Sequence, residues 1–309
     1  YMKKVTILLV LYNEEKHIKP LADSLLAQSF QNVSYYALDN NSSDRSASIL
    51  KKYLPNVILF RSEENWGFAK GNNYLAQKAV DDGCDYFFVL NTDMVLDTLC
   101  IEELVKLAES NTDIGAISPL VFFGHASKKN QSVIQSFDIN ISFRSGKVIN
   151  TCTNQIFEDL GLPEKQEVNF MHGGALFLKT KVYNKIGLFE EENFMYGDEL
   201  EFAYKFSLTK YKMLVTQNAK AWHYHVWSKN NKEGYYFKYY YIKRNKALFF
   251  HRHKQYVNIL VYVFKEIIFL PIKIKWALRI ADFKLIKFYY WGIWDGIRRK
   301  NGKATINFS

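Results

Sequence analysis

The chain has 309 residues, of which 48% are hydrophobic and 17% aromatic, so it can build a large packed core and is not a disordered protein. Its three cysteines, Cys84, Cys100 and Cys152, form no C-x-x-C pair, which argues against a disulfide framework or zinc site and favours a reducing compartment. The net charge of +10 is uneven, because residues 235–303 hold 16 Lys and Arg against 3 acidic residues. Such asymmetry indicates a polyanionic partner, either nucleic acid or an anionic membrane surface.

The first hundred residues alternate between strand and helix patterns. Apolar runs predict strands at Val5–Leu11, Val33–Leu38, Val57–Phe60 and Tyr86–Leu90, with helices at Glu14–Phe30, Ser43–Tyr53 and Ala69–Val80 between them. Ser42 or Ser43 is expected to cap the second helix. The alternation predicts a parallel sheet with right-handed crossovers, in which ligands bind beyond the carboxyl ends of the strands. The run Val5–Leu11 is too short for a secretory signal, so none is expected.

The remaining chain divides into two parts. Ile114–Phe123 and Gly174–Lys179 are predicted strands, Asp198–Leu208 is a predicted helix, and the polar segment Gly124–Asn169 is expected to be an irregular loop over the active site. From Tyr235 onward, aromatic, aliphatic and basic residues mix. We therefore expect a catalytic domain at residues 1–234 and a basic, aromatic helical region at residues 235–309.

Each of the four predicted parallel strands ends in a polar segment. The candidate ligand-binding residues in these segments are Tyr12, Asn13 and Glu14; Asp39 and Asn41; Asn65, Gly67 and Lys70; and Asn91, Thr92 and Asp93. Any one such segment is also what an ordinary strand-to-helix turn with a helix cap would contain. All four at the ligand-binding edge of one sheet favour a binding site.

Two clusters could carry chemistry. Asp93 follows an apolar strand, where a carboxylate can hold a divalent cation that bridges a diphosphate, and His223 and His225 lie on one face if their segment is a strand. This pattern predicts Mn²⁺ or Mg²⁺. Asp198 and Glu199 stand side by side at a helix start, where crowding and burial would raise one pKa into the range of a general base.

These segments, in this order, resemble family 2 glycosyltransferases of the GT-A fold, over roughly residues 4–250. The resemblance rests on Tyr12-Asn13-Glu14, on Asp39 to Asp44, on the rhamnosyltransferase-like stretch Asn65 to Asn73, on Asn91-Thr92-Asp93, and on the block from Gly173-Gly174-Ala175 through Asp198-Glu199-Leu200-Glu201. The fold implied is a Rossmann-like nucleotide-binding sheet merged with a mixed acceptor-side sheet, followed by C-terminal amphipathic helices.

The resemblance also implies roles for single residues. Asp39 would contact the nucleotide base, Asp93 and a late histidine would bind the metal, and Glu199 would be the base by position. Gly173, Gly174 and Tyr196 would lie on the acceptor side. The chain departs from the family at Asn91, where the metal-binding motif has Asp, and at Glu199, where the family has Asp. It therefore stays open whether Asp198 or Glu199 is the base, and whether His223 or His225 binds the metal. A catalytically impaired protein that binds the sugar nucleotide is a further alternative.

The expected reaction is transfer of a sugar, with inversion, from a nucleotide-sugar to a hydroxyl group. The rhamnosyltransferase-like stretch favours dTDP-L-rhamnose as donor, with UDP-sugars next, and the expected acceptor is a lipid-linked glycan of surface-polysaccharide biosynthesis. A nucleic-acid-binding protein would leave the acidic strand ends unexplained, so no nucleic-acid partner is expected. A processive synthase would need a transmembrane bundle and a Q-x-x-R-W motif, which the sequence lacks.

The C-terminal region is expected to hold the enzyme at a membrane. Tyr256–Ile272 is apolar, but Lys265 and Glu266 interrupt it, so it is not predicted to span a bilayer. Ile259–Lys300 alternates apolar and aromatic residues with Lys and Arg at helical spacing, as helices at an anionic membrane surface do. The predicted location is cytoplasmic, peripheral on the inner face of the membrane. The alternative is a helix pair packed on the catalytic domain or on a second copy in a homodimer.

Overall fold

The computed structural model of the chain describes residues 2–124, 133–224 and 231–308. The strands are Val5–Leu11 (β1), Val33–Asp39 (β2), Ile58–Arg61 (β3), Tyr86–Leu90 (β4), Met94–Leu96 (β5), Ile114–Phe123 (β6), Ile134–Ser136 (β7), Ile139–Ser142 (β8), Lys147–Asn150 (β9), Lys165–Val168 (β10), Ala175–Lys179 (β11) and Lys212–His223 (β12). The helices are Glu15–Leu26 (α1), Ser46–Tyr53 (α2), Gly67–Asp81 (α3), Cys100–Ser110 (α4), Thr180–Ile186 (α5), Asp198–Ser207 (α6), Lys232–Arg252 (α7), Tyr256–Ile268 (α8), Leu270–Ile280 (α9) and Phe283–Ile297 (α10).

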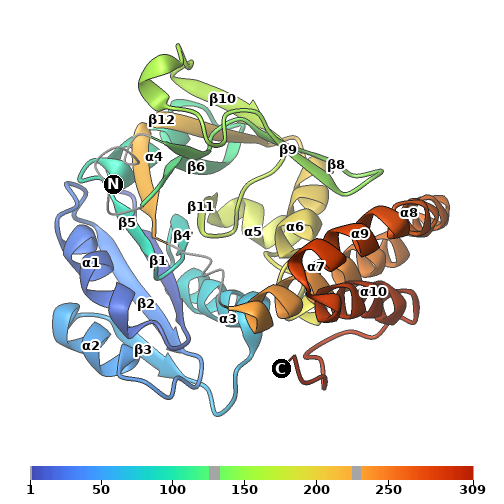
Figure 1. The fold of residues 1–309 in the computed structure, drawn as a ribbon. Coiled ribbons are helices and arrows are strands. Elements are labelled where there is room, and N and C mark those ends of the chain that lie inside the picture. The colour runs from blue at the N-terminus through green and yellow to red at the C-terminus, as the bar shows by residue number, and fades with distance from the viewer. Residues whose placement is uncertain (1, 125–132, 225–230, 309) are drawn as a thin grey trace.

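One mixed sheet runs through the centre of the catalytic region (Figure 1), in the order β10-β12-β6-β11-β4-β1-β2-β3. The strands β4, β1, β2 and β3 are parallel neighbours, as the alternation of strands and helices predicted. Strand β11 is antiparallel to both β4 and β6 and joins the parallel half to the rest of the sheet. The carboxyl ends of β1, β2 and β4 therefore lie at the same edge of the sheet as the start of β11, which pairs with the end of β4. A site is expected at this edge.

The predicted helix cap at Ser42 or Ser43 is wrong. Helix α2 begins later, at Ser46, and its N-cap residue is Arg45. The two serines instead join the loop after β2 to the loop after β1: the Ser42 hydroxyl accepts a bond from the Asn13 amide, and the Ser43 amide donates to the Asn13 side chain. These cross-loop bonds replace the capping bonds, because the serines lie too far before the helix.

The segment expected to be an irregular loop is partly ordered into strands. Within the described residues 133–169, β7 pairs with β6, β8 pairs with β9, and β10 pairs with β12. Ile134, Ile139 and Ile141 are buried in the main core, so short alternating apolar positions form strands in a segment that is otherwise polar. The β8–β9 hairpin projects toward the C-terminal helices (Figure 1).

Four helices follow β12 and pack on one another beside the sheet (Figure 1). Helix α10 packs along α7, and the backbones approach closely because Gly292 and Gly296 carry no side chain: a Cβ atom at Gly292 would lie 2.3 Å from the Tyr240 carbonyl oxygen. Phe249 and Phe250 of α7 belong to the main core. None of the described helices is both long and apolar enough to cross a membrane.

Candidate active site

A cavity of about 510 Å³ opens where the parallel strands end. The predicted site residues that line it are Tyr12, Glu14, Asn65, Gly67, Asn91, Thr92, Asp93, Gly174, Tyr196, Glu199 and His223. They come from the ends of β1, β4 and β12, and from the starts of β11, α3 and α6. Six segments that are far apart in the sequence thus contribute to one hollow.

The other predicted residues lie outside the lining. Asn13 and Asn41 lie in the two loops joined by the serines, and both have left-handed backbones, with φ of 57° and 64°. The Lys70 ammonium lies 4.5 Å from the centre of the Trp66 ring. Gly173 stands next to the lining residue Gly174, Asp198 is buried behind Glu199, and His225 lies outside the described residues.

Asp39 ends β2 and is 3% exposed. One carboxylate oxygen accepts a bond from the Ser42 amide at 2.9 Å, and the other lies 3.5 Å from Nε of the exposed Arg61. The next residue, Asn40, donates to the Asn65 side chain and to the Gly67 carbonyl oxygen. The loop after β2 is therefore tied to the loop before α3, which positions one wall of the cavity.

Gly67 is required by its surroundings. Its φ is +78°, and a Cβ atom there would lie 2.2 Å from the carbonyl oxygen of Phe194. The next amide, that of Phe68, donates to the same oxygen at 3.0 Å. The start of α3 therefore lies directly against the segment that precedes α6, and only glycine permits this approach.

Asp93 and His223 form the polar floor of the cavity. The Nε2 atom of His223 lies 3.1 Å from a carboxylate oxygen of Asp93, and Nδ1 lies 3.0 Å from the Gln135 side-chain oxygen. His172 lies at the same cavity, and burial lowers its pKa to about 4, so its ring is neutral near pH 7. A buried carboxylate facing an imidazole is a donor set that suits Mn²⁺.

These residues fit a metal ion only in part. Within the described residues, no group of three or more His, Cys, Asp and Glu side chains is arranged to hold a metal. The protein side chains would thus supply Asp93 and His223, and the phosphates of a bound nucleotide would have to complete the coordination sphere, as they commonly do for divalent cations in such sites.

Asp198 and Glu199 begin α6, and only Glu199 lines the cavity. Its carboxylate accepts a bond from the Gly173 amide at 3.4 Å. Burial raises the pKa of Glu199 above its ordinary value. Burial, followed by the charge of Glu199, raises the pKa of Asp198 further. Asp198 is 1% exposed, so of the two carboxyl groups Glu199 is the one that a substrate can reach.

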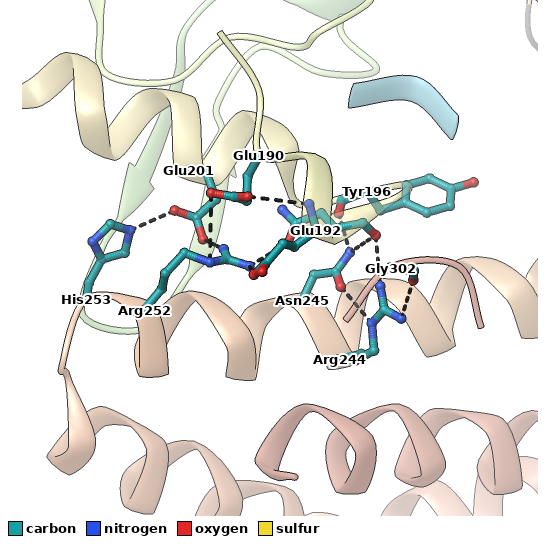
Figure 2. A network of polar contacts seen from close by, with 10 residues as sticks. Glu190, Glu192, Tyr196, Glu201, Arg244, Asn245, Arg252, His253 and Gly302 are labelled. Carbon is teal, nitrogen blue, oxygen red and sulfur yellow. Dashed lines mark hydrogen bonds and ion pairs between the residues drawn. The ribbon is translucent and has the colours of Figure 1, made fainter. Parts of the chain in front are cut away.

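The segment before α6 is held in an unusual conformation. Phe194, Tyr196 and Gly197 have φ of 63°, 61° and 81°, and the left-handed region costs a residue other than glycine on the order of 1–2 kcal/mol. The Asn245 amide of α7 holds this segment by donating to the carbonyl oxygens of Asn193, Met195 and Tyr196, at 3.0, 2.9 and 2.6 Å. Figure 2 shows Asn245 reaching from α7 to the backbone at Tyr196.

Arg244 completes this anchor from the buried side. Its guanidinium donates to the carbonyl oxygens of Asn193 and Gly302, at 2.9 and 2.7 Å, and lies 4.5 Å from the centre of the Tyr241 ring. Its Nε donates to the Asn245 side chain at 2.9 Å (Figure 2). The C-terminal helices therefore determine the backbone position of the segment that leads into Glu199.

Glu201 of α6 is bound by residues at the end of α7. Glu201 is 2% exposed, and its carboxylate pairs with Arg252 and with His253 Nε2, the latter at 2.7 Å (Figure 2). A buried carboxylate takes cations that reach into the core, and the end of α7 supplies them.

The lining also contains polar residues that lie outside all of the sequence motifs, namely Gln135, His172 and Lys238. His172 immediately precedes the Gly173-Gly174 pair, and that position could have drawn attention to it. Gln135 lies in the segment taken for an irregular loop, and Lys238 lies in the region taken for a membrane contact, so neither carried a local signal.

Known proteins share the sequence pattern and the fold. Residues 6–187 match the family described as Glycosyl transferase family 2. A low-salt glycan biosynthesis hexosyltransferase of Haloferax volcanii is 26% identical over 212 residues, which make up 65% of this chain and 61% of that protein. An N-acetylglucosaminyl-diphospho-decaprenol L-rhamnosyltransferase of Mycobacterium tuberculosis is 22% identical over 230 residues, 70% of this chain and 75% of that protein. The match thus spans less than two thirds of the Haloferax relative.

The fold agrees with a solved relative of low sequence identity. A mannosyltransferase from Pyrobaculum calidifontis, in complex with GDP-Man and Mn²⁺, superposes with a TM-score of 0.60 over 97% of this chain and 88% of its own, at 14% identity. The predicted GT-A architecture with C-terminal helices is therefore confirmed. Because the family match covers more than half of the sequence, the chain belongs to glycosyl transferase family 2.

Proposed function

We propose that the protein is an inverting transferase that moves a sugar from a nucleotide-sugar to a hydroxyl group, with Glu199 as the base. The observation that carries this proposal is that Glu199 and the Asp93–His223 pair line the same cavity. A base for the acceptor and polar groups for a diphosphate are thus available at one site. Asp39, buried at the end of β2, is the proposed contact of the nucleotide base.

In this mechanism Glu199 acts while ionised. Its carboxylate accepts the proton of the acceptor hydroxyl as that oxygen forms a bond to the anomeric carbon. The bond from this carbon to the diphosphate oxygen breaks, and the nucleoside diphosphate leaves with the electron pair. Because the acceptor attacks opposite the leaving group, the anomeric configuration inverts. The Gly173 amide, which hydrogen-bonds Glu199, orients the carboxylate.

Asp93 and His223 are the proposed holders of Mn²⁺ or Mg²⁺, and His225 is the further candidate from the sequence. When bound, such an ion neutralises charge on the diphosphate. The solved relative from Pyrobaculum is a complex with Mn²⁺, which supports the proposal. His172 is neutral near pH 7 and adds no positive charge that would compete with a cation.

For the donor we propose dTDP-L-rhamnose, and for the acceptor a lipid-linked glycan of surface-polysaccharide biosynthesis. The mycobacterial relative, by its description, is an L-rhamnosyltransferase acting on N-acetylglucosaminyl-diphospho-decaprenol. A UDP-sugar-dependent transferase of the same fold is the second candidate. A catalytically impaired sugar-nucleotide-binding protein is the third, because Asn91 and Glu199 stand where the family pattern has Asp.

A donor panel tests these assignments. Thermal unfolding with dTDP, UDP and GDP, each with and without Mn²⁺, should show stabilisation by one nucleotide, and hydrolysis of the matching sugar nucleotides should follow the same preference. Stabilisation by UDP alone would replace the proposed donor by a UDP-sugar. Stabilisation without hydrolysis or transfer to any acceptor would favour the impaired protein.

We also propose that α8 and α9 lie on an anionic membrane surface, which fits a peripheral protein of the inner, cytoplasmic face. These helices expose large apolar side chains that include Leu260, Phe264 and Ile272, at 70%, 64% and 63%. Lys265, Lys275 and Arg279 lie on the same two helices and are exposed. Apolar surface beside cations is what interfacial helices present to anionic lipid.

Co-sedimentation with vesicles tests this surface. The wild-type protein should bind vesicles that contain phosphatidylglycerol and not vesicles of phosphatidylcholine alone, and salt should weaken the binding. Its mass should be measured without lipid. A stable dimer that binds neither kind of vesicle would assign the apolar surface to a second copy and overturn the membrane proposal.

A further inference from the structure

A second cavity, of about 500 Å³, lies among the C-terminal helices, apart from the active site. The turn of the β8–β9 hairpin covers one side, with Arg144 and Ser145, and α7 to α10 form the rest. The turn packs directly on a lysine, because a Cβ atom at Gly146 would lie 3.0 Å from Cε of Lys246. The volume is within the range of about 300–1,000 Å³ that is typical of small-molecule sites.

The cavity is strongly cationic. Arg144, Lys246, Lys265 and Lys273 line it, against the single carboxylate of Glu266. That carboxylate is already occupied, because Lys243 donates to one oxygen at 3.0 Å, while Lys273 and the Tyr289 hydroxyl donate to the other. Three of the four lining cations therefore face the cavity without a carboxylate of their own.

Lys246 is the cation most in need of an anion. Its ammonium lies 4.7 Å from the centre of the Tyr262 ring, and no acidic side chain of the described residues pairs with it. Burial, followed by the charge of Lys243, lowers the pKa of Lys246 to about 8. The Lys246 side chain is half-buried, and Glu266 acts on it only through its charge while other donors bind that carboxylate. An anionic ligand would therefore meet a partly desolvated cation.

The rim of the cavity is apolar and continues onto the surface of α8 and α9. Val257, Val261 and Phe269 line the cavity and are 71%, 44% and 51% exposed. They adjoin the exposed side chains Leu260, Phe264 and Ile268 of α8. A ligand held here would have its anion among the cations and hydrocarbon against the rim, which is the chemistry of a lipid with a phosphate headgroup.

We propose that this cavity binds the phosphodiester headgroup of an anionic phospholipid between Arg144, Lys246 and Lys265, with the acyl chains over Val261 and Phe269. The proposal rests on the membrane contact proposed above and adds a discrete site to it. One lipid would thus be held by the β8–β9 turn and by α7 and α8 together. General attraction by surface charge would need no such cavity.

Two probes separate the site from the surface. Calorimetry with dihexanoyl-phosphatidylglycerol, below the concentration at which it forms micelles, measures binding to the site alone, and co-sedimentation with phosphatidylglycerol vesicles measures the whole surface. Lys246→Gln removes a cation of the cavity. Lys275→Gln is the matched control, because Lys275 is an exposed lysine of α9 that does not line the cavity.

The wild type should bind one soluble lipid per chain. Lys246→Gln should weaken this binding about tenfold or more, whereas Lys275→Gln should leave it unchanged and weaken only vesicle binding, by roughly fivefold. Arg144→Gln, on an exposed turn, should repeat the effect of Lys246→Gln if the latter variant proves poorly folded by its thermal transition. Lys246→Gln and Arg144→Gln should retain sugar-nucleotide hydrolysis, because neither Lys246 nor Arg144 lines the cavity that contains Glu199.

The outcomes distinguish the two proposals. Equal losses of vesicle binding for Lys246→Gln and Lys275→Gln, without saturable binding of the soluble lipid, would overturn the discrete site and leave the membrane contact standing. Saturable lipid binding without vesicle binding would overturn the membrane contact instead. If inorganic phosphate competes with the soluble lipid at equal affinity, the cavity is a site for free phosphate and the lipid assignment is wrong.

Discussion

Asn245 offers the sharpest test of how the fold serves the proposed reaction. Substitution by Ala removes the amide that donates to three carbonyl oxygens before α6. Asn193 retains a second donor, Arg244, but Met195 and Tyr196 lose theirs. Arg244 also loses the acceptor of its Nε.

The structure gives the size of both effects. Each buried polar group left without a hydrogen-bond partner lowers the free energy of unfolding by about 1–3 kcal/mol. Relaxation of Phe194 and Tyr196 out of the left-handed region offsets part of this loss, by about 1–2 kcal/mol for each residue. We therefore expect a loss of about 1–4 kcal/mol in the free energy of unfolding, which leaves a typical domain folded. The relaxation moves the segment that leads into Glu199, and a displacement of about 1 Å lowers a rate by roughly 10²-fold.

The assay is the initial rate of sugar transfer, read as kcat and KM for the donor, beside thermal unfolding. For Asn245→Ala kcat should fall while the donor KM changes little, because Asp39, Asp93 and His223 lie on other elements. Tyr236→Phe is the control, because Tyr236 stands on the same helix and its hydroxyl donates to Asp282, at 2.8 and 2.9 Å, and not to the segment before α6. Wild-type kcat in Asn245→Ala, or an equal loss in Tyr236→Phe, would refute the reasoning.

Other substitutions test the site residue by residue. Glu199→Gln should lower kcat by about 10²–10⁴-fold and retain donor binding by calorimetry; if Asp198→Asn is the inactive variant instead, the roles are exchanged. Because burial raises the pKa of Glu199 above 4.5 and only the ionised carboxylate accepts a proton, wild-type kcat should rise with pH through that raised pKa; a rate already constant from pH 4.5 upward contradicts this. Asp93→Ala should abolish Mn²⁺-dependent nucleotide binding with an unchanged circular dichroism spectrum, and full metal-dependent activity would remove Asp93 from the metal site. Gly67→Ala, at φ +78° and 2.2 Å from a carbonyl oxygen of Phe194, should destabilise the fold by about 1–3 kcal/mol, and an unchanged melting temperature would show that the contact yields.

The sequence predicted most of the parallel half of the sheet, because apolar runs such as Tyr86–Leu90 are buried on both faces and leave a clear signal. The order of the motifs along the sequence also led us to expect Asp93 and Glu199 in the same site. The sequence missed the strands within residues 133–169, where two or three alternating apolar positions are too few to stand out.

The contacts of Asn245 and Arg244 with the segment before α6 could not be predicted from the local sequence. No pattern in the sequence of α7 marks Asn245. Its hydrogen-bond acceptors are backbone carbonyl oxygens, which every residue has, so the sequence does not indicate which of them it contacts. The cations of Glu201 stand about fifty residues away, whereas a helix pattern suggests only neighbours three or four positions distant. Such contacts are determined by tertiary packing.

The contact between Arg244 and the Gly302 carbonyl oxygen also has a consequence for the order of events during synthesis. About a hundred residues separate Glu199 from Gly302, and ribosomes add roughly 5–20 residues each second. The nucleotide-binding half can therefore fold several seconds before the buried guanidinium acquires its last acceptor. Under the proposed mechanism, a nascent chain would bind the sugar nucleotide before it could transfer the sugar, because the segment before Glu199 gains its full anchor only after Gly302 is added.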